Sequence, residues 1–217
     1  RMIQYINSIK DIHYLGVISY SNADIKNPQP MWIWRKSTKM PDEIYNFGEI
    51  LAKTPRLYIR KFNLNDIKPM YNIMKNPLNM KNIATGKVKS KDDVKNIITR
   101  YIKEQYMYYP ICLKDKKIIG YIGFYSGKYL PLPYYIRYRY YLRILIDINY
   151  QKKGYGGEIL VGFTKYLLNK LNYKNINSLI EESNIPSIKI HKKAKFIENK
   201  QRVILNGKTH ILFSKGK

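Results

Sequence analysis

The sequence predicts a mixed α/β sandwich around one central sheet flanked by helices, in the order β-α-α-β-β-β-α-β-α-β-β, with a small N-terminal extension. Three observations predict this class. From Arg56 onward, stretches with strand alternation and stretches with helical apolar spacing follow one another. A glycine cluster at 154–157 stands between a long strand and a helix. Near the C-terminus, Asn206-Gly207 predicts the turn of a hairpin.

We expect residues 1–54 to form the extension and residues 55–217 to form the main domain. Two strands, at about 12–20 and 31–34, are expected in the extension from their alternation. A short helix from Pro41 to about Ala52 is expected after them, because acidic residues follow the proline where the helix dipole favours them. Trp32 and Trp34 share one face of an extended strand, and packing onto the main domain is favoured over a binding surface.

The main domain has clear element boundaries. Ser90 can cap the amide of Asp93 and so begin a helix, whereas Asn76-Pro77 is expected to end the helix before it. The expected strands lie at 57–62, 111–113, 118–125, 134–148, 176–182, 202–205 and 209–213, and the expected helices at 65–76, 90–102, 155–171 and 186–194.

Composition limits the class of protein. Hydrophobic residues make up 45% of the 217, which is enough for a core, and no apolar run approaches the about 18 residues of a membrane span. With Cys112 as the sole cysteine, an intrachain disulfide or a cysteine-rich metal site is excluded. No signal-peptide pattern opens the sequence, so we expect a cytoplasmic or otherwise intracellular protein without a metal.

The net charge of +25 raises the question of nucleic-acid binding. The basic residues are scattered, and the abundance of Lys, Ile, Asn and Tyr fits an AT-rich genome, such as that of a large DNA virus. Residues 1–54 hold 7 Lys and Arg against 5 Asp and Glu, so most of the excess lies in the main domain. A phosphate-bearing small molecule is therefore favoured over nucleic acid as the partner of this charge.

The glycine cluster suits phosphate binding. A helix N-terminus offers unpaired amides and the positive end of the helix dipole. Glycines let the backbone approach phosphate oxygens, and the two lysines before them add positive charge. The residues predicted to bind phosphate are Gln151, Lys152, Lys153, Gly154, Tyr155, Gly156 and Gly157.

The element order, with Gln151-x-x-Gly154-x-Gly156 between strand and helix, resembles the GNAT superfamily of acetyltransferases. The segments 56–66, Ile119–Gly123 and Gly154–Glu158 look like its protein N-terminal branch, which acetylates the alanine of a ribosomal protein. The resemblance covers about residues 56–217. It implies acetyl-CoA as cosubstrate and a primary amine as acceptor.

The resemblance also implies where the thioester is bound. In the family, the strand before the glycine cluster separates from its parallel neighbour, here 176–182, and the thioester lies in the gap. Backbone amides around Ile146 and Ile148 would bind pantetheine, and one would stabilise the oxygen that gains charge. Asn184 would bind the pantetheine region, and Ser187 matches a small residue at the start of the next helix.

Two catalytic residues are expected. His191 occupies the position where the family usually has a tyrosine that protonates the departing thiolate, and an imidazolium could do the same; a role in packing or at the surface is the alternative. Glu181, at the end of its strand, is the preferred base, with a solvated carboxylate as the alternative. Glu104 is a further candidate for holding the amine. Lys195 replaces a family glycine, so the local turn is expected to be either strained or rearranged.

The predicted function is direct acetyl transfer to a primary amine, with a protein or peptide N-terminus favoured and a small amine next. The alternative is a nucleic-acid-binding or regulatory protein that keeps the fold without transferase activity. No membrane partner is expected, and the pattern leaves a homodimer open.

Overall fold

The computed structural model describes residues 12–18, 31–36, 50–83, 86–103 and 107–216. The chain divides into two compact units, residues 1–46 and 47–217. In the first unit, β1 (Ile12–Ile18) and β2 (Met31–Lys36) pair in antiparallel fashion, so both predicted strands are present. The packing expected of Trp32 and Trp34 concerns side chains outside the described part of the structure.

The start of the second unit differs from the prediction. β3 (Ile50–Lys53) is a strand that pairs with β4 (Leu57–Arg60), whereas the sequence predicts a helix as far as Ala52; residues 41–49 of that helix lie outside the described residues. The proline and acidic residues that favour a helix all precede this stretch, which is held instead by pairing at the sheet edge. The described part of the second unit thus begins with β3, and the domain boundary expected between residues 54 and 55 stays a prediction.

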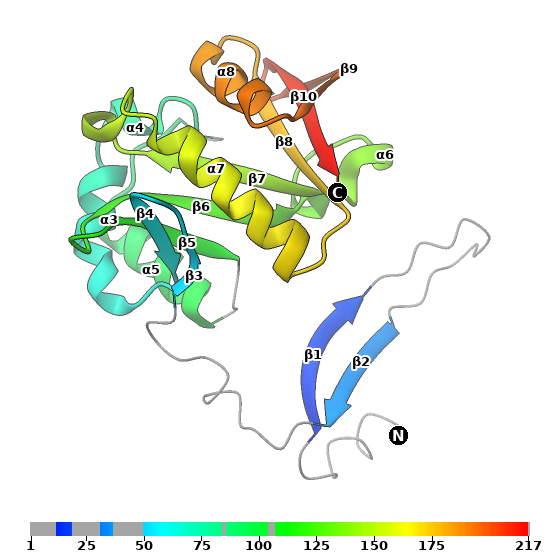
Figure 1. Cartoon of the computed structure of the whole chain (residues 1–217), viewed down its shortest axis with the longest axis horizontal. Helices are drawn as coiled ribbons and strands as arrows, with labels where there is room; N and C mark the ends of the chain where they lie inside the picture. Colours follow the sequence, from blue (N-terminus) through cyan, green and yellow to red (C-terminus); the bar gives the residue numbers. More distant parts are fainter. Residues whose placement is uncertain (1–11, 19–30, 37–49, 84–85, 104–106, 217) are drawn as a thin grey trace. The chain divides into compact units, whose positions relative to one another are not determined.

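One sheet of eight strands forms the centre of this unit, in the order β3-β4-β5-β6-β7-β8-β10-β9 (Figure 1). Neighbouring strands are antiparallel except for β7 and β8, which are parallel. The remaining strands are β5 (Tyr108–Leu113), β6 (Ile118–Ser126), β7 (Tyr140–Ile146), β8 (Asn175–Glu181), β9 (Ile197–Leu205) and β10 (Lys208–Gly216). The prediction of a mixed central sheet is confirmed.

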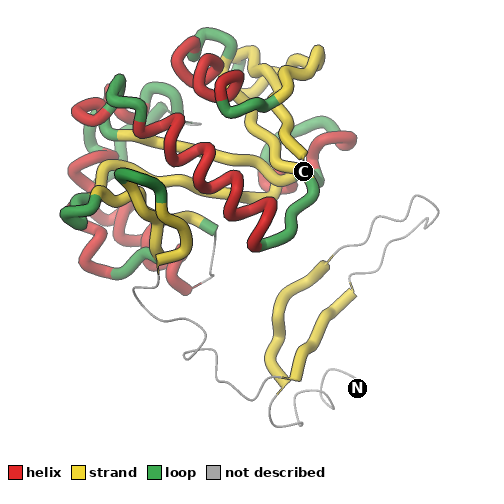
Figure 2. The backbone as a smooth tube through the Cα atoms, in the orientation of Figure 1, coloured by secondary structure: helices red, strands yellow, loops and turns green. Residues whose placement is uncertain are grey.

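Helices cover both faces of the sheet (Figure 2). On one face, α7 contributes Ile159, Leu160 and Phe163 to the larger buried cluster. On the other face, Met70 and Ile98 belong to a second cluster beneath α3 and α5. The helices are α3 (Ile67–Met74), α4 (Pro77–Met80), α5 (Lys91–Lys103), α6 (Tyr134–Arg137), α7 (Tyr155–Lys165) and α8 (Ile185–Lys193).

Short turns complete the fold. They are the 3-10 turns η1 (Leu64–Asp66), η2 (Gly127–Tyr129) and η3 (Ile148–Tyr150), and the π-helical turn η4 (Tyr166–Lys170) that continues α7. The capping predicted for α5 is confirmed, because Ser90 Oγ accepts from the Asp93 amide at 3.1 Å. In the described part of the chain, none of the helices combines the length and the apolar composition of a membrane span.

Two further elements correct the prediction. The strand expected at 134–148 is shorter, because Pro133 begins the helical turn α6 and β7 starts only at Tyr140. The Tyr141 hydroxyl donates to the Ile136 carbonyl at 2.9 Å and holds that turn against the sheet. Asn76-Pro77 does not simply end a helix, since the Asn76 side chain caps the additional turn α4, where proline is tolerated at the first position.

Candidate active site

The site is built on the separation of β7 from β8. These parallel strands pair at Tyr141 and Asn177 alone, whereas β6 and β7 remain paired from Ser126–Tyr140 to Gly120–Ile146. The Asn177 side chain closes the joined end by donating to the Tyr140 carbonyl at 3.1 Å. Beyond this point, the C-terminal halves of β7 and β8 diverge, as the family resemblance implies, and α7 and α8 begin beyond their ends (Figure 1).

Backbone groups of β7 line the resulting gap. The Asp147 amide donates to the Ile119 carbonyl of β6 at 2.8 Å, and successive amides in a strand point to opposite edges. The amide and carbonyl of Ile146 therefore face the gap, and the predicted contact of this amide with pantetheine stays a prediction. The Ile148 amide instead donates to Asn79 Oδ1 at 2.6 Å, so the structure gives this predicted donor a partner outside the gap. Gln151 lies at the gap, where Nε2 donates to the Ile146 carbonyl at 2.8 Å.

The glycine cluster forms the entrance to α7. Gly154 is the N-cap in a left-handed conformation at φ +82°, which glycine adopts without a Cβ clash. The first helical bond runs from the Glu158 amide to the Gly154 carbonyl, so the amides of residues 155–157 have no acceptor within the helix. A Cβ on Gly156 would lie 3.5 Å from Ile190 of α8, an ordinary contact distance, so the packing of the two helices does not by itself require glycine here. The arrangement suits a phosphate oxygen at this helix start.

A side-chain brace holds the glycine turn against β4. Arg56 Nε donates to Glu158 Oε2 at 2.7 Å, and Arg56 Nη1 donates to the Lys153 carbonyl at 3.0 Å. The Arg56 guanidinium also lies 4.5 Å from the centre of the Tyr155 ring. Thr54 Oγ1 donates to Glu158 Oε1 at 2.6 Å. Burial raises the pKa of Glu158, but the hydrogen bonds from Thr54 and Arg56 outweigh it and lower the pKa below its usual value.

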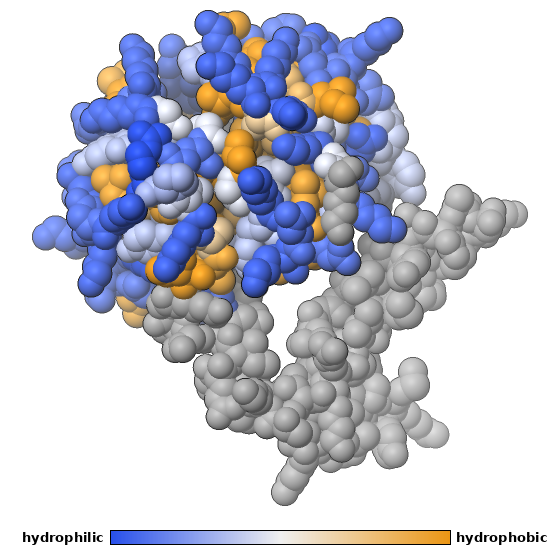
Figure 3. Space-filling model, in the orientation of Figure 1, coloured by the Kyte–Doolittle hydropathy of each residue, from blue (hydrophilic) through white to orange (hydrophobic). Residues whose placement is uncertain are grey.

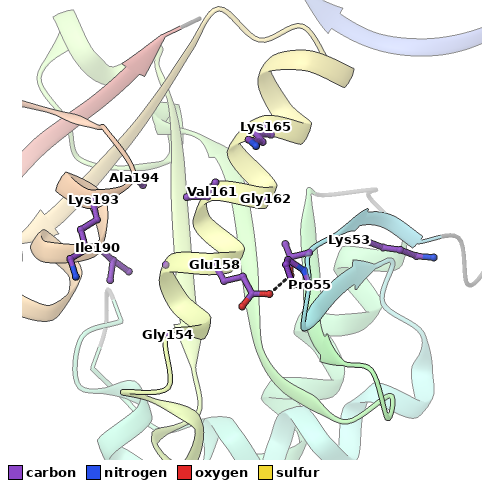
Figure 4. Close-up of a pocket in the computed structure, with 12 residues that line it drawn as sticks. Lys53, Pro55, Gly154, Glu158, Val161, Gly162, Lys165, Ile190, Lys193 and Ala194 are labelled. Carbon is purple, nitrogen blue, oxygen red and sulfur yellow. Dashed lines mark hydrogen bonds between the residues drawn. The ribbon is translucent and has the colours of Figure 1, made fainter.

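A cleft of about 620 Å³ runs along α7, between α8 and the turn that joins β3 to β4 (Figure 4). Its lining includes Lys53, Lys165 and Lys193, together with Gly154 and Gly157. The lining carboxylate, Glu158, points toward the β3–β4 turn and is engaged there. On the face seen in Figure 3, hydrophilic side chains surround small hydrophobic patches. The Lys53 side chain points away from α7 in Figure 4, and Lys165 is the last residue of that helix. The part of the cleft suited to a phosphate is therefore the open N-terminus of α7 at Gly154 and Gly157.

The start of α8 lies beyond the end of β8, on the other side of the gap. Asn184 is the N-cap of α8, and its Oδ1 accepts from the Ser187 amide at 3.2 Å. Both residues are therefore where the sequence places them, at a helix start beside the gap. Their predicted contact with pantetheine stays a prediction.

His191 lies in the core. Its side chain is 4% exposed, and its ring packs 5.1 Å from the Phe196 ring. Nδ1 donates to the Ser187 carbonyl at 2.8 Å, which leaves Nε2 to accept from the Ser178 hydroxyl at 3.0 Å. Burial lowers the pKa of His191 to about 4, so the imidazole is neutral at pH 7. This geometry favours the packing role over the imidazolium acid, which stays a prediction.

The turn that ends α8 contains Lys195, at the position where the family has a glycine. The Phe196 amide donates to the His191 carbonyl at 3.0 Å, and the Lys195 amide donates to the Lys192 carbonyl at 3.0 Å. These two bonds form a Schellman motif, in which the residue after the C-cap is left-handed. Lys195 has φ +60°, which is the strain expected for a lysine in a position that favours glycine.

Glu181 lies at the end of β8, as expected. Lys208 Nζ donates to Oε2 at 2.8 Å and the Ser183 hydroxyl donates to Oε1 at 2.6 Å. Lys208, and then Ser183, hold the pKa of Glu181 below its usual value, which makes the carboxylate a weaker base. The role of Glu181 as base stays a prediction. Glu104 lies outside the described residues.

A mixed sheet divided between two parallel strands, with a glycine-rich helix start at the division, defines an acyltransferase of the GNAT type. Residues 56–197 match the model of the family described as "Acetyltransferase (GNAT) domain", so the chain belongs to this family. The family makes the chain an N-acetyltransferase.

Individual proteins resemble the chain more distantly. It is 29% identical over 141 residues to YnaD, an uncharacterised N-acetyltransferase of Bacillus subtilis (strain 168), which covers 64% of this chain and 78% of that protein. Spermidine N-acetyltransferase from Vibrio cholerae, in complex with CoA and spermine, shares the fold with a TM-score of 0.62 at 17% identity, over 74% of this chain and 95% of the other. RimL, a ribosomal L7/L12 alpha-N-protein acetyltransferase in complex with coenzyme A, shares the fold with a TM-score of 0.62 at 15% identity. The match covers 77% of this chain and 98% of RimL.

Proposed function

We propose that the chain transfers the acetyl group of acetyl-CoA directly to a primary amine, and that the amine is a protein or peptide N-terminus. The observation that carries this proposal is the open gap between β7 and β8, with the Ile146 amide facing it and the unpaired amides of residues 155–157 at its entrance. The adjoining cleft includes Gly154 and Gly157 of the helix start, which fits a phosphate of the cosubstrate.

Acetyl-CoA supplies a thioester whose carbonyl carbon is attacked by the amine and whose sulfur leaves as a thiolate. The Ile146 amide is suited to donate to the carbonyl oxygen as it gains negative charge. Glu181, at the end of β8, is the proposed acceptor of the proton that the amine loses. His191 remains the proposed proton donor only if its contacts with Ser187 and Ser178 open during turnover.

No covalent enzyme intermediate is needed for this reaction. Cys112 is fully buried, and burial raises the pKa of its thiol to about 11, so it stays protonated at neutral pH. Steady-state kinetics with both substrates varied should therefore give the intersecting pattern of a ternary complex. Parallel lines, with acetyl label retained on the enzyme, would refute direct transfer.

A peptide acceptor is supported by the likeness to RimL, which acts on a ribosomal protein, and by charge. With a net charge of +25, the chain repels polycations more strongly than peptides, so an acceptor such as the spermine bound by the Vibrio cholerae enzyme is less suitable. The sequence resemblance to the protein N-terminal branch points the same way.

A turnover screen over peptides and small amines tests the proposal. The expected result is acetylation of peptide α-amines at rates above those for polyamines and aminoglycosides, with one CoA released per acetyl group. Turnover confined to small amines would refute the acceptor class. Tight DNA binding that weakens steeply with salt, combined with absent turnover, would favour the nucleic-acid-binding alternative.

A further inference from the structure

A charged side chain that the proposed chemistry does not use lies on β7. Leu142 and Ile146 of this strand pack into the cluster under α7. Side chains alternate between the faces of a strand, so Arg143 lies on the opposite face, with Leu145. It follows Tyr141, where β7 last pairs with β8, and precedes Ile146, whose amide faces the gap. Arg143 is therefore about 7 Å along the strand from the closed end of the gap, at 3.3 Å per residue.

The surroundings of Arg143 are aromatic. Its guanidinium carbon lies 4.9 Å from the centre of the Tyr125 ring, and Nη2 donates to the Tyr125 hydroxyl at 3.4 Å. The Arg143 guanidinium also acts on the Tyr121 phenol, whose pKa burial raises and the nearby positive charge lowers. Tyr101 and Tyr108 stack on each other at 4.4 Å as the next layer of the same cluster. The guanidinium thus lies in a lining of tyrosines.

Gly123 makes room for this arrangement. It is the cross-strand neighbour of both Arg143 on β7 and Tyr108 on β5. A Cβ on Gly123 would lie 2.3 Å from Cε1 of Tyr108, so the tyrosine ring covers the glycine backbone. Across the three strands, Arg143, Gly123 and Tyr108 therefore form a row in which glycine places no side chain between the guanidinium and the tyrosine ring.

Within the described residues, no carboxylate forms an ion pair with Arg143. Burial lowers the pKa of Arg143, but the neighbouring tyrosines Tyr125, Tyr108 and Tyr121 outweigh it and raise the pKa above its usual value. A half-buried guanidinium without an anion is costly, and the bond to the Tyr125 hydroxyl engages one of its five N–H donors. By contrast, Arg60 is held bidentately by Asp66, at 2.7 and 2.8 Å. Arg143 thus has the capacity to bind an anion from outside.

Glu181 shares this face of the sheet. Tyr141 and Asn177 are opposite each other in the parallel pair, so Arg143 and Glu181 both extend to the same side by alternation. On this face, Glu181 lies at the end of β8 on one side of the gap, and the Arg143 guanidinium lies over Tyr125 of β6 on the other side. These charges suit a molecule that carries both an amine and an anion.

We propose that Arg143 determines acceptor specificity by binding a carboxylate close to the acceptor amine, so that the preferred substrate is a peptide N-terminus with an acidic residue among its first positions. This inference rests on the proposed acetyl transfer and names the acceptor more closely. Tyr125 orients the guanidinium, and the aromatic lining reduces solvent screening around the ion pair.

Matched acceptors test the proposal. One peptide pair differs by Glu or Gln at the second position, and one pair of small aliphatic amines differs by a carboxylate or a carboxamide. We expect the wild-type enzyme to show a kcat/KM about 10- to 100-fold higher for the carboxylate member of the peptide pair, as for a charge-assisted hydrogen bond. Arg143→Gln should remove this preference, and Arg143→Lys should restore part of it.

The controls separate specificity from folding. Arg137→Gln removes an exposed arginine of α6 and should keep the preference. In Arg143→Gln, activity on the carboxamide peptide and the KM for acetyl-CoA should stay within about threefold of wild type, whereas structural damage would lower activity on both members equally.

Four outcomes count against the inference. An equal loss on both members of a pair, or a wild-type enzyme without preference, refutes the role of Arg143 while acetyl transfer stands. If only the small amines are acetylated, and Arg143 is needed for the preference for the carboxylate member, a peptide acceptor is refuted. The contact between Arg143 and a carboxylate is then retained. Absence of turnover with every acceptor refutes the proposed function and the inference together.

Discussion

Replacing His191 with Phe should change how the stability of the protein depends on pH. In the native state, burial lowers the pKa of His191 to about 4, against an ordinary value of 6.5. The unfolded chain therefore binds a proton at His191 more readily than the native protein does. The stability that the neutral imidazole provides is fully present above pH 6.5 and is lost as the pH falls toward 4.

The size of the effect follows from the two pKa values. Each pH unit within this window costs about 1.4 kcal/mol of unfolding free energy per proton taken up. Between pH 8 and pH 5, His191 should thus account for a loss of about 2 kcal/mol in the wild-type protein. The His191→Phe variant has no imidazole to protonate, so its unfolding free energy should fall by about 2 kcal/mol less than that of the wild type between pH 8 and pH 5. At pH 8 the variant should be less stable by about 1–3 kcal/mol, because the Ser187 carbonyl and the Ser178 hydroxyl lose their partner.

Urea unfolding at pH 8 and pH 5 measures both effects, with the wild type and His191→Phe compared at each pH. Ser178→Ala is a matched control, since it removes one hydrogen bond and leaves the imidazole buried, so it should keep the wild-type pH dependence. A difference between wild type and His191→Phe that is the same at both pH values would refute the buried, neutral histidine. The imidazolium acid would then regain its support, and the turnover number of His191→Phe would have to fall sharply.

Two further substitutions test the structure near the site. Lys195→Gly should stabilise the protein by about 1 kcal/mol in urea unfolding, because glycine adopts the φ of +60° without strain. As a control, Lys189→Gly inside α8 should destabilise the protein by a similar amount. A Lys195→Gly variant that is less stable than the wild type would contradict the Schellman motif at this turn. Glu158→Gln should raise the KM for acetyl-CoA about three- to tenfold and leave kcat within about twofold, because the brace to Arg56 positions the glycine turn. Glu198→Gln, which weakens ion pairs with Lys192 and Arg202 away from the turn, should not change that KM.

Much of the fold could be predicted because its signals are local. The capping pair at Ser90 and the Asn-Gly turn at 206–207 each depend on neighbouring residues, and both elements form as expected. The stretch at 134–137 was harder, because its alternation of tyrosine and arginine also fits a strand. The deciding contact is the bond from the Tyr141 hydroxyl to the Ile136 carbonyl, which exists only once the chain has folded back.

The candidate site likewise has features that the sequence predicts and features that only the folded structure reveals. The glycine turn could be found from composition and spacing, because backbone conformation requires those residues. The brace could not, since Arg56 and Glu158 are 102 positions apart and neither is unusual in its local context. His191 resembled a catalytic residue at its position in the sequence, and its buried contact with Ser178 on β8 emerges from tertiary packing alone.

Calorimetric titration with acetyl-CoA and with acetyl-pantetheine tests the central claim most directly. We predict micromolar binding of acetyl-CoA by the wild-type protein, and binding at least about 100-fold weaker for acetyl-pantetheine, because the latter lacks the phosphates that the amides at the start of α7 would hold. Absent binding of acetyl-CoA, or equal affinity for the two compounds, would contradict a cosubstrate site at the glycine turn.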